Sequence, residues 1–257
     1  MSILNRFFQS DRKVAGQGAA GTVGRRLVVG NWKCHKTSDE ARRWLDAFAQ
    51  SYAPVAGLEV VLAPTMLSLE HVARHLGELR LEGVALAAQD VSPFPRGGYT
   101  GAVAADMLKG LVDYVIVGHS ERRRYFHEKV ADVTNKVGEV VDAGLRPIVC
   151  VDRPEVRSQL SGLADLETGD TVVAYCPVDA LSFRIPESTA QVVEAVGEIG
   201  GIFAGRPVLY GGSLTPDNVG AYLGIAELAG VFVGSASLEV DSFQAVCRQA
   251  AETVQPR

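Results

Sequence analysis

The stretch DYVIVGHSERRRYFHEKVADVTNKVGEVVDAGLRPIVCV (113–151) decides the fold, because it holds two apolar runs on either side of one helical segment. The runs DYVIVG (113–118) and RPIVCV (146–151) are apolar almost throughout, which is typical of parallel strands covered on both faces. Residues 129–143 between them repeat their apolar side chains with the period of a helix. The stretch therefore predicts a strand–helix–strand unit with a right-handed crossover.

The same alternation of strand and helix runs from Leu27 to the end of the chain. The other predicted strands cover 27–31, 58–63, 84–89, 171–176, 206–211 and 230–235. The other predicted helices cover 38–51, 66–78, 104–110, 154–164, 187–198, 215–223 and 241–253. Ser38 and Asp39 are candidate caps of the first of these helices. Eight units, one about every 30 residues, favour a closed (β/α)8 barrel over an open doubly wound sheet.

The domain organisation follows from the continuity of this pattern. No linker-like stretch interrupts the eight units, so we expect residues 26–257 to form a single domain of the α/β class. Residues 1–25 include the Gly- and Ala-rich run VAGQGAAGTVG and too short an apolar run for a signal peptide. We expect them to form a flexible N-terminal extension outside the fold.

The composition excludes several classes of partner. The 257 residues include 25 Lys and Arg against 30 Asp and Glu, a net charge of −5, so broad binding to nucleic acid or to a membrane surface is not expected. No apolar run approaches the roughly 20 residues that a membrane helix requires. The cysteines are too far apart for a CxxC metal or redox motif. We therefore expect a cytoplasmic protein with reduced thiols and no metal.

Candidate reactive side chains follow the predicted strands, because the active site of a (β/α)8 barrel lies at the carboxyl ends of its strands. Asn31 and Lys33 follow the first strand, His119 follows the fourth, and Cys176 ends the sixth. Each of these residues alone also has an ordinary structural explanation. A lysine is usually solvated, a histidine at a strand end is often hydrogen-bonded by its neighbours, and a free cysteine often only packs.

Two turns of small residues, GGS (211–213) and VGS (233–235), follow the seventh and eighth strands. Small residues leave backbone N–H groups uncovered, and such groups bind anions. Tight turns without a ligand are the alternative explanation. Two such turns on adjacent strands favour a phosphate site, because many barrels hold phosphate at this place.

These pieces together resemble the triosephosphate isomerase family, and the resemblance extends from Leu27 to the last helix. The motifs that carry it are VVGNWK (28–33), AQDVSPFPRGGYTG (88–101), YVIVGHSERRRYF (114–126), YGGSLTPDN (210–218) and GVFVGSASL (230–238). The resemblance implies a TIM barrel, a cytoplasmic homodimer without cofactor or metal, and interconversion of dihydroxyacetone phosphate and glyceraldehyde 3-phosphate. The partner it implies is thus a small phosphorylated substrate.

The resemblance also implies a role for each site residue. Asn31 and Lys33 would bind the substrate, and His119 would polarise its carbonyl and move protons between its two oxygens. Glu121 would be a buried partner of the lysine. Thr100 would lie in the dimer-forming loop 90–101. The phosphate would be held by Gly212, Ser213, Gly234 and Ser235.

One loop departs from the family. The sequence AYCPVDALSFRI (174–185) stands where the family has AYEPVWAIGTGK, so Cys176 occupies the position of the general base. Within the lid (177–185), Asp179 replaces a tryptophan and two glycines are absent. A thiol has a pKa of about 8.5 against about 4.3 for a glutamate, so little of it is ionised at neutral pH. We therefore expect weak or altered isomerase activity.

Smaller departures lie on other loops. Asp90 replaces an asparagine, and CVDR (150–153) stands where the family has CIGE, so that the acidic residue of that motif is lost. Glu128 and Lys136 match a buried ion-pair region of the family. The scaffold is thus kept, while one edge of the site is rebuilt.

Three hypotheses remain open at this point. The protein could be an altered isomerase in which Cys176 acts as a thiolate whose pKa Lys33 lowers. It could be a non-catalytic pseudo-enzyme that binds a phosphorylated metabolite and has a regulatory role. It could also be a barrel with a degenerate pocket whose function lies on its outer surface. The presence of both Lys33 and His119 favours the first hypothesis.

Overall fold

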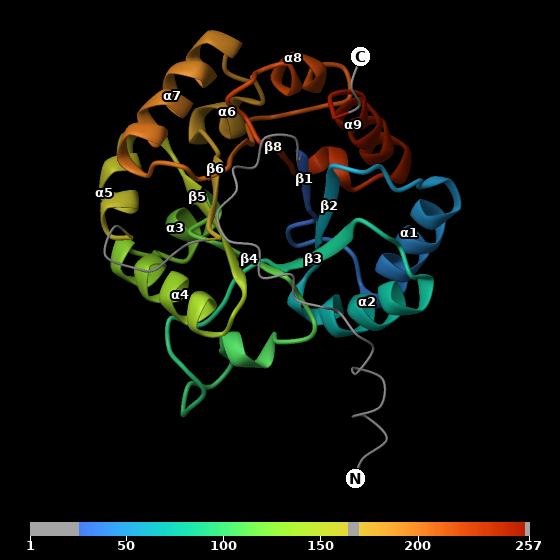
Figure 1. The fold of residues 1–257 in the computed structure, drawn as a ribbon. Helices are drawn as coiled ribbons and strands as arrows, with labels where there is room; N and C mark the ends of the chain where they lie inside the picture. The colour runs from blue at the N-terminus through green and yellow to red at the C-terminus, as the bar shows by residue number, and fades with distance from the viewer. Residues whose placement is uncertain (1–25, 164–169, 255–257) are drawn as a thin grey trace.

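The strands form a closed parallel barrel. A computed structural model describes residues 26–163 and 170–254, and the expected extension over residues 1–25 lies outside the described residues. The strands pair in sequence order and β8 pairs with β1, which confirms the predicted barrel (Figure 1). Their bounds are β1 (Arg26–Asn31), β2 (Leu58–Ala63), β3 (Val84–Ala88), β4 (Tyr114–Val117), β5 (Arg146–Val151), β6 (Val172–Tyr175), β7 (Val208–Tyr210) and β8 (Gly230–Val233).

Two apolar layers explain why the strands are apolar along their whole length. Side chains alternate between the two faces of a strand. In β5, Ile148 and Cys150 pack inside the barrel, whereas Val149 and Val151 pack between the barrel and the helices. Both faces of each strand are therefore buried, as the continuous apolar runs predict.

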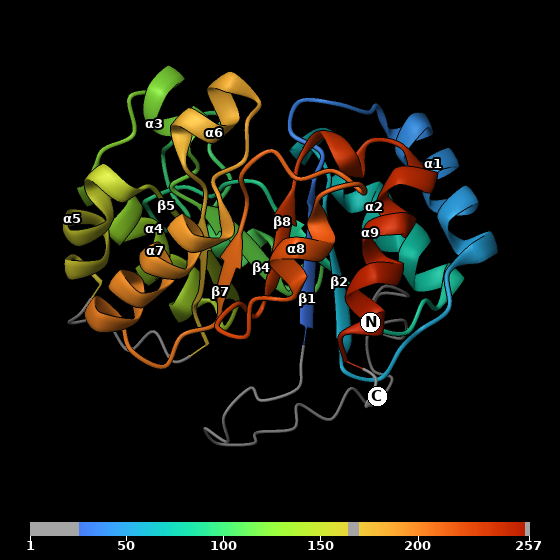
Figure 2. The same cartoon turned by 90° about the horizontal axis from the view of Figure 1, so that it is seen from above.

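The helices surround this barrel, apart from two short ones at its mouth. Figure 2 shows α3 and α6 together at one end, beyond the carboxyl ends of the strands. None of the helices in the described ranges combines the length and hydropathy needed to cross a membrane. The helices are α1 (Ser38–Ser51), α2 (Met66–Leu79), α3 (Ser120–Tyr125), α4 (Val130–Asp142), α5 (Val156–Ser161), α6 (Val178–Phe183), α7 (Thr189–Ile202), α8 (Val219–Leu223) and α9 (Val240–Glu252).

The cap of α1 differs from the prediction. Thr37, not Ser38 or Asp39, is the N-cap: its hydroxyl accepts the N–H of Glu40, and the Glu40 carboxylate accepts the N–H of Thr37 at 2.7 Å. Ser38 and Asp39 are already the first residues of the helix. This reciprocal pair satisfies two backbone donors that a helix start otherwise leaves free.

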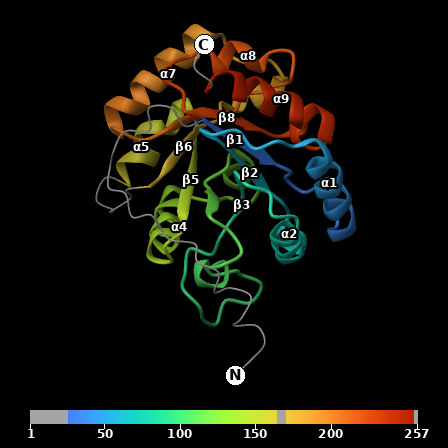
Figure 3. The ribbon, with the colours of Figure 1, turned by 45° about the vertical axis from the view of Figure 1, so that its right-hand side comes forward.

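The helix predicted over 104–110 is wrong. Only the short 3-10 helix η2 (Ala105–Met107) forms there, with hydrogen bonds between residues three apart, and Gly110 has a φ of 79° that no helix accommodates. The helix predicted over 154–164 begins as the 3-10 helix η3 (Arg153–Glu155) and continues as α5. The segment between β3 and β4, which contains η2, projects from the barrel (Figure 3).

One glycine closes the barrel. Gly230 of β8 pairs with Leu27 of β1, and a Cβ atom at Gly230 would lie 1.9 Å from the carbonyl oxygen of Leu27. The backbones of the first and last strands therefore approach each other where only a hydrogen atom fits. Beside this seam, the Leu27 N–H donates to the carbonyl of Ala229 at 3.0 Å.

Candidate active site

The structure brings Lys33, Glu121 and His119 together at the mouth of the barrel. The ammonium Nζ of Lys33 lies 2.5 Å from Oε1 of Glu121, and Nδ1 of His119 lies 3.6 Å from Oε2 of the same carboxylate. The Glu121 side chain is 42% exposed, so it is half-exposed in the single chain rather than buried. Glu121 thus links the lysine to the histidine.

Asn31 shapes the backbone that presents the lysine. Lys33 has a φ of 52°, in the left-handed region that a side chain disfavours. The side-chain oxygen of Asn31 accepts the N–H of Lys33 at 2.9 Å and so supports this conformation. Strained residues of this kind cluster at functional sites.

His119 is held neutral by its surroundings. His119 is 5% exposed, and its Nδ1 accepts a hydrogen bond from the backbone N–H of Glu121 at 3.2 Å. Burial lowers the pKa of His119 to about 4; the Glu121 charge opposes that shift, and the Lys33 charge adds to it. Because Nδ1 accepts, the neutral ring carries its hydrogen on Nε2. His119 is therefore a hydrogen-bond donor without a charge at neutral pH.

The second turn of small residues lies beside Lys33. A Cβ atom at Gly234 would lie 3.3 Å from Cε and 3.9 Å from Nζ of Lys33, so the lysine passes directly over the second turn. Within the described residues, the N–H groups of Gly212, Ser213, Gly234 and Ser235 donate to no other backbone group. Free N–H groups next to an ammonium suit a small anion.

Cys176 lies inside the barrel and its thiol stays protonated. The residue is 1% exposed, and a Cβ atom at Gly211 would lie 2.7 Å from its Sγ. A hydrogen bond with the Cys150 thiol, and then burial, raise the pKa of Cys176 well above its usual value; the Lys33 charge lowers it less. Burial and the contact with Cys150 therefore argue against the hypothesis of a thiolate activated by Lys33.

The lid segment forms a helix that sequence reasoning missed. Within residues 177–185, α6 (Val178–Phe183) follows Pro177, and its C-cap Arg184 has a φ of 56°. The Ser213 hydroxyl donates to the carbonyl of Ala180 at 2.8 Å, so the first turn of small residues (211–213) is tied to this helix. The absence of the two family glycines was the available signal, because glycine disfavours a helix.

A second missed residue, Asp152, supports the start of α6. The Val178 N–H points to Oδ1 of Asp152 at 3.4 Å, and the Arg153 N–H donates to the same oxygen at 2.9 Å. Val178 is the first residue of α6, whose N–H has no partner within the helix. The loop after β5 is therefore tied to the rebuilt lid.

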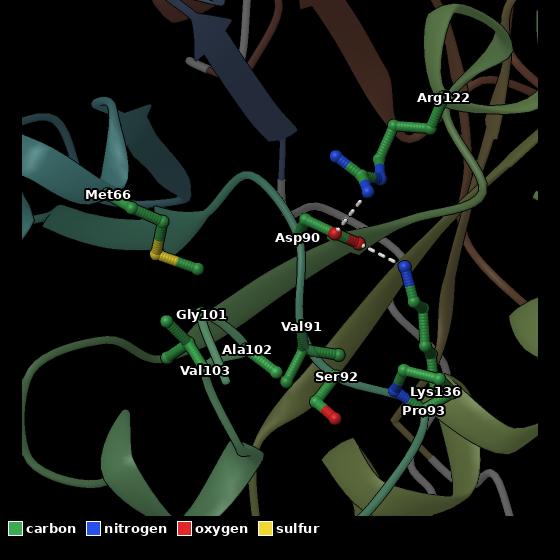
Figure 4. Close-up of a pocket in the computed structure, with 10 residues that line it drawn as sticks. All are labelled: Met66, Asp90, Val91, Ser92, Pro93, Gly101, Ala102, Val103, Arg122 and Lys136. Carbon is green, nitrogen blue, oxygen red and sulfur yellow. Dashed lines mark hydrogen bonds and ion pairs between the residues drawn. The ribbon is translucent and has the colours of Figure 1, made fainter. Parts of the chain in front are cut away.

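A cluster of partly buried ion pairs lies next to a cavity with a volume of about 380 Å³ (Figure 4). Asp90 lies 2.6 Å from Nζ of Lys136 and 2.8 Å from Nη2 of Arg122. Glu128 joins the same two cations. Burial raises the pKa of Asp90, and the Lys136 charge opposes that shift. The cluster fixes the root of the projecting segment after β3.

The fold and the side chains at its mouth define a (β/α)8-barrel enzyme of the isomerase class. The chain belongs to the triosephosphate isomerase family, whose model matches residues 26–250. It is 38% identical to the triosephosphate isomerase of Symbiobacterium thermophilum, across 88% of this chain and 97% of the relative. It is 37% identical to that of Thermus thermophilus, across 86% and 97%, and 36% identical to that of Deinococcus radiodurans, across 83% and 94%.

Proposed function

We propose that this protein is an aldose–ketose isomerase for a small phosphorylated hydroxy-aldehyde or ketone, of the dihydroxyacetone phosphate and glyceraldehyde 3-phosphate type, with weak or altered activity. The observation that carries the proposal is the neutral His119 beside the Lys33–Glu121 pair and the two turns of small residues. A neutral donor, a cation and an anion site suit a substrate with one carbonyl and one phosphate.

Each described group has a task in this reaction. Lys33 attracts the phosphate, and the N–H groups of Gly212, Ser213, Gly234 and Ser235 hold it. Asn31 fixes the backbone of Lys33 and lines the substrate site. Glu121 positions the lysine through its ion pair, and its N–H keeps His119 in one tautomer. His119 then donates to the carbonyl oxygen and moves a proton between the two substrate oxygens.

The altered activity follows from the position of the family's base. Cys176 carries a protonated, fully buried thiol, so it contributes no base at neutral pH. Removal of a positioned base lowers the rate by about 10² to 10⁴. The same observation favours the second candidate, a regulatory pseudo-enzyme that binds a phosphorylated metabolite without turnover.

The assembly is part of the proposal. The segment that carries Thr100 exposes Phe94, Tyr99 and Met107 to solvent, and the rings of Phe94 and Tyr99 stack at 4.7 Å. Apolar side chains gathered on one projecting segment suit a protein interface. We therefore propose a cytoplasmic homodimer in which the loop around Thr100 enters the second copy, with residues 26–257 as one domain and 1–25 as its extension.

Turnover of glyceraldehyde 3-phosphate separates the two candidates. For an isomerase, the wild type converts the substrate, His119→Gln lowers kcat about 100-fold or more, and Cys176→Ser leaves kcat within about threefold. Cys176→Glu tests the base position, and we expect it to raise kcat. Calorimetry with inorganic phosphate runs in parallel. Phosphate binding without turnover in the wild type would support the pseudo-enzyme, and loss of both would refute both candidates.

A further inference from the structure

The end of β5 places a carboxylate next to Cys176. Asp152 has a φ of −132° and a ψ of 148°, so the chain remains extended one residue beyond β5. In the ladder between β5 and β6, Val151 pairs with Tyr175, and the Cys176 N–H donates to the carbonyl of Val151 at 2.9 Å. The next pair in this register is therefore Asp152 with Cys176.

The side chains of Asp152 and Cys176 both point from their strands toward the inside of the barrel. Cys150 and Cys176 belong to the inner apolar layer, whereas Val151 and Tyr175 belong to the outer layer. Because an extended chain alternates its side chains, Asp152 projects to the same side as Cys150. Neighbouring strands lie about 4.8 Å apart. The Asp152 side chain thus starts next to position 176, where the family has its catalytic glutamate.

We propose that Asp152 is the general base of this site, in place of the missing glutamate at position 176. The inference rests on the proposed isomerase function. Two departures from the family coincide here: Asp152 stands at the glycine of the CIGE motif, and Cys176 stands at the family's glutamate. This chain therefore has a carboxylate after β5, whereas the family has one after β6.

The surroundings of Asp152 suit a base that is held by one oxygen. Oδ1 accepts the N–H groups of Arg153 and Val178, and no hydrogen bond within the described residues uses Oδ2. Burial raises the pKa of Asp152, while these two N–H groups and the charge of Arg123 oppose the shift and Asp179 adds to it. A carboxylate with a raised pKa takes a proton more readily, so the environment supports the role.

Three other carboxylates near this edge of the barrel already have cationic or hydroxyl partners. Glu187 accepts the hydroxyl of Tyr175 on the outer side of β6. Glu155 lies 3.4 Å from Nε of Arg123, and Glu121 pairs with Lys33. Among these four carboxylates, Asp152 is the one whose hydrogen bonds within the described residues come from backbone N–H groups alone, so it is available for proton transfer.

The reaction balances without a further reactant. The Asp152 carboxylate takes a proton from the carbon next to the carbonyl, and the electron pair of that C–H bond forms the C=C bond of an enediol. The carbonyl π pair becomes an O–H bond with a proton from His119. His119 recovers a proton from the neighbouring hydroxyl, whose electrons form the new C=O bond, and Asp152 returns its proton to the other carbon.

The test measures proton abstraction directly. Dihydroxyacetone phosphate is incubated with the full chain in D₂O, and proton NMR follows deuterium incorporation at carbon and product formation. The variants are Asp152→Asn, Asp152→Glu and, as a matched control at an exposed aspartate at the end of α4, Asp142→Asn. Asparagine keeps an oxygen for the Arg153 and Val178 N–H groups, so the fold of the loop is preserved.

We expect Asp152→Asn to lower kcat for exchange by about 10² to 10⁴ with KM within about threefold, and Asp142→Asn to keep kcat within about threefold of the wild type. Asp152→Glu should retain more activity than Asp152→Asn. The kcat/KM of the wild type should fall as the pH drops into the acid range. The residual kcat/KM of Asp152→Asn should not show this acid limb of the pH profile. A merely structural role would not remove this limb.

The outcomes separate the two levels of the proposal. If the wild type exchanges and Asp152→Asn stays within threefold of it, Asp152 is not the base, and the isomerase stands. If the wild type binds phosphate but shows no exchange, the isomerase itself fails and the base with it. If Asp152→Asn does not fold, two other measurements still test the proposal. It is overturned if kcat/KM of the wild type does not fall in acid, or if Asp152→Glu folds but shows no exchange above the rate without enzyme.

Discussion

At the scale of single residues, His119 links the site to the stability of the protein. Its pKa is about 4 in the folded chain and about 6.5 when unfolded, so the unfolded chain binds more protons between these values. The free energy of unfolding therefore falls as the pH drops from 6.5 to 4, by roughly 3 kcal/mol from this group.

Denaturant titrations of the wild type and His119→Gln between pH 7 and 4.5 check this prediction. The variant should lose stability less steeply with falling pH than the wild type. The raised pKa values of Asp90 and Asp152 act in the opposite direction, but both proteins share them, so the difference isolates the histidine. Parallel curves for the two proteins would contradict a buried, neutral His119.

At the scale of secondary structure, the capping pair of α1 makes a measurable contribution. Thr37→Ala removes the hydroxyl that accepts the Glu40 N–H, and we expect a loss of about 1 kcal/mol in the free energy of unfolding. Ser38→Ala is the matched control, because Ser38 already lies inside the helix. An equal loss in both variants, measured by urea denaturation, would show that the cap is wrongly assigned.

Elements with a clear apolar pattern could be predicted from the sequence, and a helix that depends on distant contacts could not. α1 and the apolar strands carry their period within themselves, so their patterns suffice. α6 has six residues, too few for a stable isolated helix, and contacts with Asp152 and Ser213 support it. The helix expected over 104–110 failed for the converse reason, because no comparable support forms there beyond one 3-10 turn.

The candidate site shows the same division. The motifs around Lys33 and His119 are contiguous in the sequence, so each motif could be recognised from its own residues. The protonation of Cys176 depends on its contact with Cys150, on a different strand. The place of Asp152 depends on the register between β5 and β6. Distant contacts of this kind leave no local pattern to read.

At the scale of the whole molecule, closure of the barrel depends on Gly230. Gly230→Ala places a methyl group 1.9 Å from the Leu27 carbonyl oxygen, so β8 and β1 must separate. We expect a loss of several kcal/mol, or no folded protein, by circular dichroism and thermal melting. Gly77→Ala is the control: a Cβ atom there meets nothing within 4 Å, and helix propensity favours it. A Gly230→Ala variant as stable as the wild type would contradict the close approach of β1 and β8 at this residue.

The proposed dimer makes a prediction at the same scale. Thr100 is exposed in its loop, and in the proposed dimer a charge placed there would have to enter the second copy. Thr100→Asp should therefore convert the dimer into a monomer in sedimentation velocity at micromolar concentration. Leu67→Asp, on the exposed surface of α2, should leave the sedimentation coefficient unchanged. A wild type that sediments as a monomer would refute the assembly.

The pairing of β1 with β8 also has a consequence for the synthesis of the protein. A ribosome releases β1 before every other strand, yet one of its two neighbours is the strand translated last. Throughout synthesis, β1 therefore presents an unpaired edge to the cell, and such edges recruit other chains. Slow translation of the segment that precedes β8 should therefore raise aggregation of the nascent chain.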